Sequence, residues 1–221
     1  TANKIRILPS SVANQIAAGE VIERPASIIK ELLENSIDAG SDSIIVTVRQ
    51  AGNSLIRITD NGCGISKDDL PYAICQHATS KLHTLADLDN IASLGFRGEA
   101  LASICAVAKC KIISHIRDEE QAWSLEVADN SANYNILPAA HPFGTTIEVS
   151  DLFYNLPVRK RFLKSDKTEY QQIIDVFQKM ALSNFSCAFT LINENKVVYK
   201  LLKADTKAAR IHRVKKIFGS M

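Results

Sequence analysis

The sequence predicts an α+β sandwich in which one mixed, mostly antiparallel sheet carries helices packed on one face. Three observations support this fold class. Predicted strands follow one another as hairpins, with helical segments interspersed among them. The strict strand-helix-strand alternation of a doubly wound sheet is missing. Hydrophobic residues make up 46% of the 221 residues, so one large core can form without disulfides.

Each element is predicted from a local signal. The first helix is expected to begin at Ser10 or Ser11 and to end before Gly19. The second is expected to begin at Pro25 and to be closed by Gly40. The remaining helices are expected at 67–75, 85–94, 97–108, 157–164, 168–185 and 206–219. Strands are expected at 5–8, 43–50, 54–59, 109–117, 122–128, 134–140, 144–152, 187–195 and 196–202.

The composition points to an intracellular protein. Lys+Arg 26 against Asp+Glu 24 gives a net charge of +2, so any basic binding surface must be local. We find neither a signal peptide nor an apolar run of about 18 residues, so neither secretion nor a membrane span is expected. The five cysteines contain no CxxC pair and are expected to be reduced core residues of a cytoplasmic protein. They are Cys63, Cys75, Cys105, Cys110 and Cys187.

The helix that begins at Pro25 carries four polar side chains on one face. At roughly 100° per residue, Glu31, Glu34, Asn35 and Asp38 fall on one arc. A solvated acidic face is the simplest interpretation. However, nothing basic follows to pair with them, and Glu31 has an asparagine rather than a lysine four residues later. An amide oxygen can bind a hard cation, and the neighbouring carboxylate can take a proton from water.

A glycine-containing turn follows a predicted strand in ITDNGCGI. An Asp-Asn-Gly turn accounts for Gly62 but not for Gly64. Two glycines so spaced let a ligand lie against bare backbone, and Asp60 can accept a hydrogen bond from an exocyclic amine. Adenine fits that description, although the motif alone is weak evidence for a ligand.

Two further segments offer phosphate or base contacts. SLGFRGEALAS places Gly95 and Gly98 before a helix that starts near Glu99, where backbone N–H groups can hold phosphate oxygens. A loop with a glycine N-cap is the alternative. GTTIEV opens a strand with Thr145 and Thr146, whose hydroxyls can reach a phosphate or base or can simply belong to a strand.

Together these segments resemble the four nucleotide-binding motifs of the GHKL ATPase superfamily. The resemblance is closest to the N-terminal ATPase region of the MutL family of DNA mismatch repair proteins, in its bacterial form. It covers nearly all of residues 5–200 and is carried by NQIAAGEVIERPASIIKELLENSIDAG, IRITDNGCGI, HATSKL, SLGFRGEALAS and GTTIEVSDLFYNLPVRKRFLK. It implies a Bergerat-type sandwich, the cofactors ATP and Mg²⁺, and slow hydrolysis of ATP to ADP and phosphate.

The resemblance also implies roles for individual residues. Glu31 resembles the general base that activates the attacking water, Asn35 the side-chain ligand of Mg²⁺, and Asp38 a supporting residue. Asp60 resembles the residue that binds the adenine amine, with Thr145 bonding nearby through water. The other positions that match nucleotide-contacting motifs are Gly62, Gly64, Thr79, Ser80, Lys81, Leu94, Gly95, Phe96, Arg97, Gly98, Glu99, Ala100 and Leu101.

Domain organisation and partners follow from the same resemblance. Residues 1–24 are expected to be an arm that dimerises when ATP binds, 25–204 the ATP-binding domain, and 205–221 the first helix of a second domain. That domain normally supplies a lysine to the γ-phosphate, so we expect only feeble turnover from this chain. Expected partners are a second copy of the chain, DNA, a mismatch-recognition protein of the MutS type, and a downstream nuclease or helicase. A nucleoid-associated cytoplasmic location is expected.

A basic run in PVRKRFLK suggests where DNA binds. Arg159, Lys160, Arg161 and Lys164 lie within a short predicted helix, and sequence-nonspecific binding is expected to weaken steeply with salt. An ordinary solvated basic face is the alternative. Two other functions stay open: a histidine kinase lobe, and a DNA-binding or scaffolding module whose nucleotide site is idle.

Overall fold

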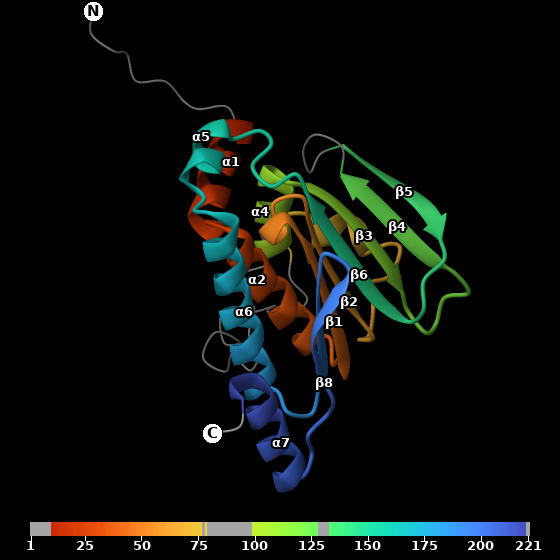
Figure 1. Ribbon diagram of the computed structural model, residues 1–221. Coiled ribbons are helices and arrows are strands. Elements are labelled where there is room, and N and C mark those ends of the chain that lie inside the picture. Colours follow the sequence, from red (N-terminus) through yellow and green to blue (C-terminus); the bar gives the residue numbers. More distant parts are fainter. Residues whose placement is uncertain (1–9, 77, 79–98, 128–132, 220–221) are drawn as a thin grey trace, which may run out of the picture.

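The structure is a computed structural model that describes residues 10–76, 78, 99–127 and 133–219. Its strands form one eight-stranded sheet in the order β5-β4-β3-β6-β2-β1-β7-β8 (Figure 1). β1 and β7 pair in parallel and the other neighbours are antiparallel. The strands are β1 (Ser43–Arg49), β2 (Leu55–Asp60), β3 (Lys109–His115), β4 (Ala122–Val127), β5 (Tyr134–Ala139), β6 (Gly144–Ser150), β7 (Ala188–Asn193) and β8 (Lys196–Leu201).

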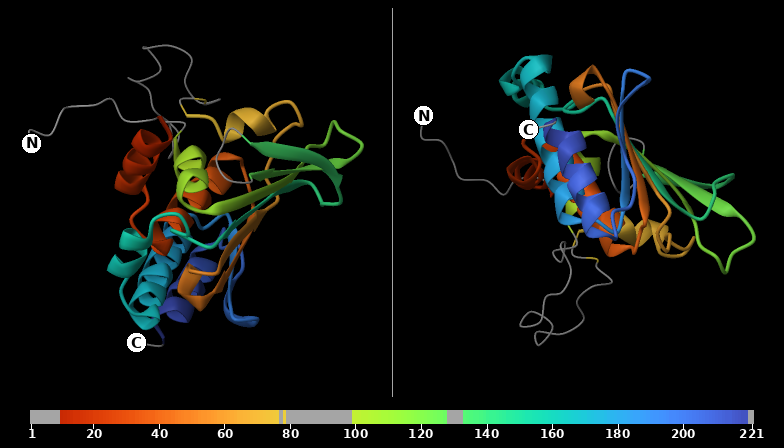
Figure 2. Two further views of the ribbon diagram at one scale, coloured as in Figure 1. Left: turned by 90° about the horizontal axis from the view of Figure 1, so that it is seen from above. Right: turned by 60° about the horizontal axis from the view of Figure 1, so that its bottom comes forward.

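The long helices cover one face of this sheet (Figures 1 and 2). The predicted fold class, a mixed and mostly antiparallel sheet with helices on one face, is therefore confirmed. Among the described helices, none is long and apolar enough to cross a membrane. The helical elements are α1 (Ser10–Val21), α2 (Pro25–Asp38), η1 (Gln50–Gly52), α3 (Leu70–Ala73), α4 (Ala100–Val107), α5 (Pro157–Phe162), α6 (Asp166–Ser183) and α7 (Lys207–Phe218).

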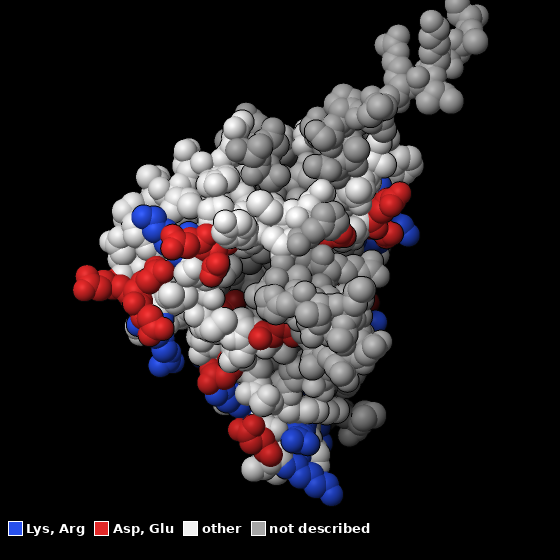
Figure 3. Space-filling model, turned by 180° about the vertical axis from the view of Figure 1, so that it is seen from behind, with Lys and Arg blue, Asp and Glu red and all other residues white. Residues whose placement is uncertain are grey.

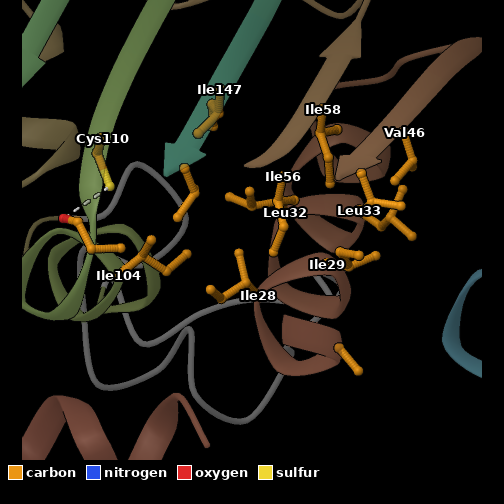
Figure 4. Packing of buried hydrophobic residues seen from close by; sticks show 14 of the residues in the cluster. Ile28, Ile29, Leu32, Leu33, Val46, Ile56, Ile58, Ile104, Cys110 and Ile147 are labelled. Atoms are coloured by element: carbon orange, nitrogen blue, oxygen red, sulfur yellow. Dashed lines mark hydrogen bonds between the residues drawn. The ribbon is translucent and has the colours of Figure 1, made fainter. Parts of the chain in front are cut away.

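The core lies between α2 and the sheet. The buried stripe of α2 recurs at helical spacing, so Ile28, Leu32 and Leu33 all face the strands. Figure 4 shows these side chains directed at the inward residues of β2, Ile56 and Ile58. Each of these five side chains is at most 2% exposed, so this packing fixes how α2 is placed relative to the end of β2.

The ends of α2 agree with the sequence prediction, whereas the end of α1 does not. Pro25 is the first residue of α2, and Gly40 has a φ of +73°, the left-handed conformation expected after a helix. α1 does not stop before Gly19 but continues to Val21. Gly19 is an interior residue of α1 that lies against the guanidinium of Arg159, since a Cβ there would come within 2.4 Å of Cζ, the far end of a flexible side chain.

The cysteine prediction is right for three residues and wrong for two. Cys105, Cys110 and Cys187 are buried, but Cys63 and Cys75 are exposed, and all five are free thiols. Burial raises the pKa of the Cys187 thiol to about 11. Only the three buried cysteines therefore behave as small apolar core residues.

α7 is basic in sequence, but one of its cations is buried. Arg213 is 2% exposed, and its guanidinium donates to the backbone carbonyls of Ala181, Asn184, Cys187 and Leu202. Two of these carbonyls lie at the C-terminal end of α6, where helix carbonyls lack intrahelical partners. Arg213 thus holds α7 to α6 and to the segment before β7.

Candidate nucleotide site

The polar face of α2 is not an ordinary solvated face. Glu34 is 9% exposed, and Glu31, Asn35 and Asp38 are half-buried. No basic residue follows these side chains within α2, but Lys30, which precedes them, pairs with this face. Lys30 Nζ lies 2.8 Å from Glu34 Oε1 and 3.6 Å from Glu31 Oε1. Burial alone would lower the pKa of Lys30, but the hydrogen bond and charges of these carboxylates raise it.

Asp60 is a buried carboxylate at the end of β2, 7% exposed. Its Oδ2 accepts a hydrogen bond from Ser36 Oγ at 2.8 Å, and its Oδ1 accepts one from the backbone N–H of Gly62 at 2.9 Å. These donors come from α2 and from the turn after β2, so both elements fix the orientation of the carboxylate. A carboxylate can accept about four hydrogen bonds, so these two leave capacity for a ligand.

The contribution of Ser36 was missed in the sequence. Ser36 lies on the side of α2 that faces the sheet and is buried, at 4% exposure. A hydroxyl inside an apolar stripe needs a hydrogen-bond partner, and that requirement was the available signal. The partner is Asp60.

Gly62 and Gly64 have structural reasons that do not involve a ligand. A Cβ on Gly62 would lie 2.8 Å from the Cβ and carbonyl oxygen of Ala39. A Cβ on Gly64 would lie 2.6 Å from the carbonyl oxygen of His115, and Gly64 has a φ of +79°. The turn therefore packs closely against Ala39 on one side and His115 on the other, and this packing fixes the position of Asp60.

The two threonines of β6 face opposite sides of the sheet. Thr145 pairs with Asp60 across the β2–β6 ladder and is 6% exposed, and its hydroxyl lies 2.9 Å from Ser114 Oγ. Thr146 points the other way, and its hydroxyl lies 2.8 Å from that of Thr59 and 2.7 Å from His141 Nε2. Of the two, only Thr145 belongs with Asp60.

Several predicted site residues lie outside the described residues. Of the glycine-rich segment before α4, the structure describes the last three positions, Glu99, Ala100 and Leu101. Glu99 is the N-cap residue of α4, which confirms the predicted helix start. The predicted positions outside the described residues are Thr79, Ser80, Lys81, Leu94, Gly95, Phe96, Arg97 and Gly98.

The described residues are better suited to binding a metal ion together with a ligand than to binding one by protein side chains alone. They contain no group of three or more His, Cys, Asp or Glu side chains that could hold a metal ion. Asn35 offers an amide oxygen, and Glu31 and Asp38 offer carboxylates on the same half-buried face. Mg²⁺ is commonly held by one or two side chains together with phosphate oxygens and water.

The basic helix α5 is an exposed element. None of its residues is buried, and Lys160 and Arg161 are exposed, as is Lys164 just beyond the end of the helix. Arg159 differs, since it is half-buried and its guanidinium lies against Gly19 of α1. Lys160 and Lys164 line a hollow of about 370 Å³. On the face shown in Figure 3, basic side chains lie in small groups among acidic ones, without a broad basic area.

The comparison with protein families decides the family. Residues 23–151 match the family described as histidine kinase-, DNA gyrase B-, and HSP90-like ATPases. The chain is also similar to the Aquifex aeolicus MutL ATPase domain complexed with ADP, with 33% identity and a TM-score of 0.71 over 90% of this chain and 70% of that one. The chain belongs to the MutL ATPase domains of this family.

Other relatives agree with this MutL assignment. The DNA mismatch repair protein MutL of Pseudomonas fluorescens is 51% identical over 99% of this chain, and that of Aeromonas salmonicida is 48% identical over 98%. A solved N-terminal domain of a DNA repair protein is 31% identical over 94% of this chain and 60% of that one, with a TM-score of 0.76. The chain spans about a third of the length of the two MutL relatives, 34% of each.

Proposed function

We propose that this chain binds ATP with Mg²⁺ and hydrolyses it slowly. The observation that carries the proposal is Asp60, a buried and oriented carboxylate beside the half-buried polar face of α2. Membership of a family of ATPases, with a solved neighbour complexed with ADP, supports a nucleotide as its ligand. In this assignment Asp60 accepts a hydrogen bond from the adenine amine, and Thr145 bonds to the base through water.

The polar face of α2 would then meet the triphosphate. Asn35 would contribute the side-chain ligand to Mg²⁺, which supplies charge neutralisation when bound, and Asp38 would support the site. Glu31 would orient the attacking water and accept its proton, because it is the half-buried carboxylate one turn before Asn35. The glycine-rich stretch Leu94–Leu101 and Thr79–Lys81 would bind the phosphates.

We further propose that nucleotide state switches a longer mismatch repair protein. Residues 1–24 would dimerise on ATP binding, 25–204 would form the switch, and 205–221 would begin a second domain. DNA would bind nonspecifically at α5 and just beyond it, through Arg159, Lys160, Arg161 and Lys164. MutS-type and nuclease or helicase partners would bind the ATP-bound form of the protein. The MutL relatives, of which this chain spans 34%, support this wider role.

A Glu31→Ala variant tests the hydrolytic assignment. We expect it to bind a non-hydrolysable ATP analogue with Mg²⁺ as the parent does, while hydrolysis of ATP falls by at least about 100-fold, the range of a lost general base. The control is Glu120→Ala, a change at an exposed glutamate between β3 and β4 that should leave both properties unchanged. Retention of full hydrolysis in Glu31→Ala would show that the base lies elsewhere.

A further inference from the structure

Asn61, the residue after Asp60, makes a set of hydrogen bonds that the nucleotide assignment does not use. Its Oδ1 accepts from the backbone N–H groups of Asp42 and Ser43, both at 3.0 Å. Its Nδ2 donates to Asp42 Oδ1 at 2.7 Å. In the reversed amide, Nδ2 would face the two backbone N–H donors and Oδ1 would face the Asp42 carboxylate. These three bonds therefore fix one orientation of the side chain.

These bonds anchor the turn 60–64 to the connection between α2 and β1. The N–H of Cys63 also donates to the carbonyl of Ala39 at 2.9 Å, and Gly62 leaves no room for a Cβ against Ala39. The N–H of Gly62 is in turn one of the two donors to Asp60. A shift of the turn would therefore move the group that orients the Asp60 carboxylate.

Asp42 is held as an ionised carboxylate, the form that accepts the hydrogen bond from the Asn61 amide. Lys203 Nζ lies 2.5 Å from Asp42 Oδ2. The hydrogen bond from Lys203, followed by the one from Asn61, lowers the pKa of Asp42. The carboxylate therefore stays ionised at neutral pH and continues to accept from the Asn61 amide. Lys203 and the Asn61 amide both bond to Asp42 at the surface, but Lys203 contacts only the Asp42 carboxylate, whereas the amide also binds the backbone of Asp42 and Ser43. We therefore expect the loss of Lys203 to disturb the position of the turn less than the loss of the amide.

We propose that Asn61 is a positioning residue for adenine recognition, which holds the turn so that Asp60 presents its carboxylate to the exocyclic amine. This inference rests on the proposed function. It adds a residue that touches no ligand itself and acts through Gly62 and Asp60. Loss of its side chain should weaken the distinction between adenine and a base that lacks the amine, which general loosening of the fold would not do.

The test measures binding of two nucleotides by calorimetry with Mg²⁺: a non-hydrolysable ATP analogue and the matching inosine analogue, which has a carbonyl in place of the amine. For Asn61→Ala we expect affinity for the adenine analogue to fall about tenfold, the loss of one or two well-placed hydrogen bonds. Affinity for the inosine analogue should change much less, and the urea midpoint should stay close to that of the parent. Lys203→Ala, the matched control, should keep the parent's preference.

A donor-acceptor swap provides the second arm. Asn61→Asp alone places a carboxylate against Asp42 and should lower adenine affinity. Adding Asp42→Asn restores a donor facing an acceptor and should recover most of the loss. An unchanged adenine preference in Asn61→Ala, or no recovery in the double variant, would overturn the inference. A parent that binds neither nucleotide would instead overturn the proposed function.

Discussion

Two buried charged side chains organise backbone at different places in this molecule, and they do so in opposite senses. Asp60 collects donors, one from Ser36 and one from the N–H of Gly62. Arg213 collects acceptors, the carbonyls of four residues on three segments. The carbonyls accept from the two terminal nitrogens of Arg213, while its Nε has no described partner. The two described bonds to Asp60 leave acceptor capacity that the proposed nucleotide would use. The two buried charges differ in what they contact: Arg213 joins segments of the fold, whereas Asp60 lies beside the half-buried polar face of α2.

This comparison predicts a large loss of stability at Arg213 with no loss of nucleotide specificity. Arg213→Ala leaves buried carbonyls without donors and should lower the free energy of unfolding by about 3 kcal/mol. Urea unfolding measures the effect. Arg210→Ala is the control, because Arg210 is exposed and donates to one carbonyl, that of Ala204, so its cost should stay below about 1 kcal/mol. Equal effects in the two variants would show that Arg213 is not a structural clamp.

Cys187, whose carbonyl binds Arg213, adds a pH dependence to that region. Burial raises the pKa of its thiol to about 11 from an ordinary value of 9.0. The folded protein therefore holds its proton while the unfolded chain loses it, so stability is complete below pH 9 and declines as the pH rises towards 11. The decline should amount to roughly 2 kcal/mol. Urea unfolding of Cys187→Ala between these pH values should show a shallower decline, and an identical slope would contradict the assignment.

Ser36 allows a test at Asp60 in which nucleotide affinity, rather than stability, is expected to change. Ser36→Ala removes one donor to the carboxylate, so we expect nucleotide affinity to fall about fivefold, the effect of about 1 kcal/mol. Calorimetric titration with a non-hydrolysable ATP analogue measures it. Ser41→Ala is the matched control, since Ser41 is also buried near the turn but has no described hydrogen-bond partner. A loss of affinity in the control equal to that in Ser36→Ala would remove the special role of the Ser36–Asp60 bond.

The exposed cations of α5, together with Lys164 just after it, provide a third case, in which the charges are not buried. Replacing Lys160, Arg161 and Lys164 by glutamine should leave stability nearly unchanged. If these residues contact phosphates, affinity for duplex DNA should become less dependent on salt. The plot of log affinity against log salt should become shallower, its negative slope shrinking in magnitude by up to about 3. The control replaces Lys207, Lys215 and Lys216 of α7, which are also exposed. Equal slopes for the parent and the α5 variant would exclude α5 as the DNA surface.

The sequence could predict those parts that depend on local periodicity and on short, specific motifs. The eight described strands, the bounds of α2 and the place of Asp60 follow from alternating residues, from Pro25 and Gly40, and from the turn glycines. The strand expected at 5–8 and the helix expected at 85–94 lie outside the described residues. What it could not supply are contacts between segments far apart in the chain. The pairing of Ser36 with Asp60 and the carbonyls around Arg213 depend on the folded arrangement. The predicted end of α1 before Gly19 was wrong because a glycine inside a helix costs only about 1 kcal/mol, so its presence alone does not end the helix.

The central claim is that Asp60 accepts a hydrogen bond from adenine, and one titration tests it directly. The parent and Asp60→Asn are each titrated with a non-hydrolysable ATP analogue and Mg²⁺, beside urea unfolding of both. We expect the parent to bind and the variant to lose at least about 30-fold in affinity, since a charged acceptor is replaced by a neutral amide. Its stability should change far less than that of Arg213→Ala. Equal binding by parent and variant would contradict the assignment of adenine to Asp60.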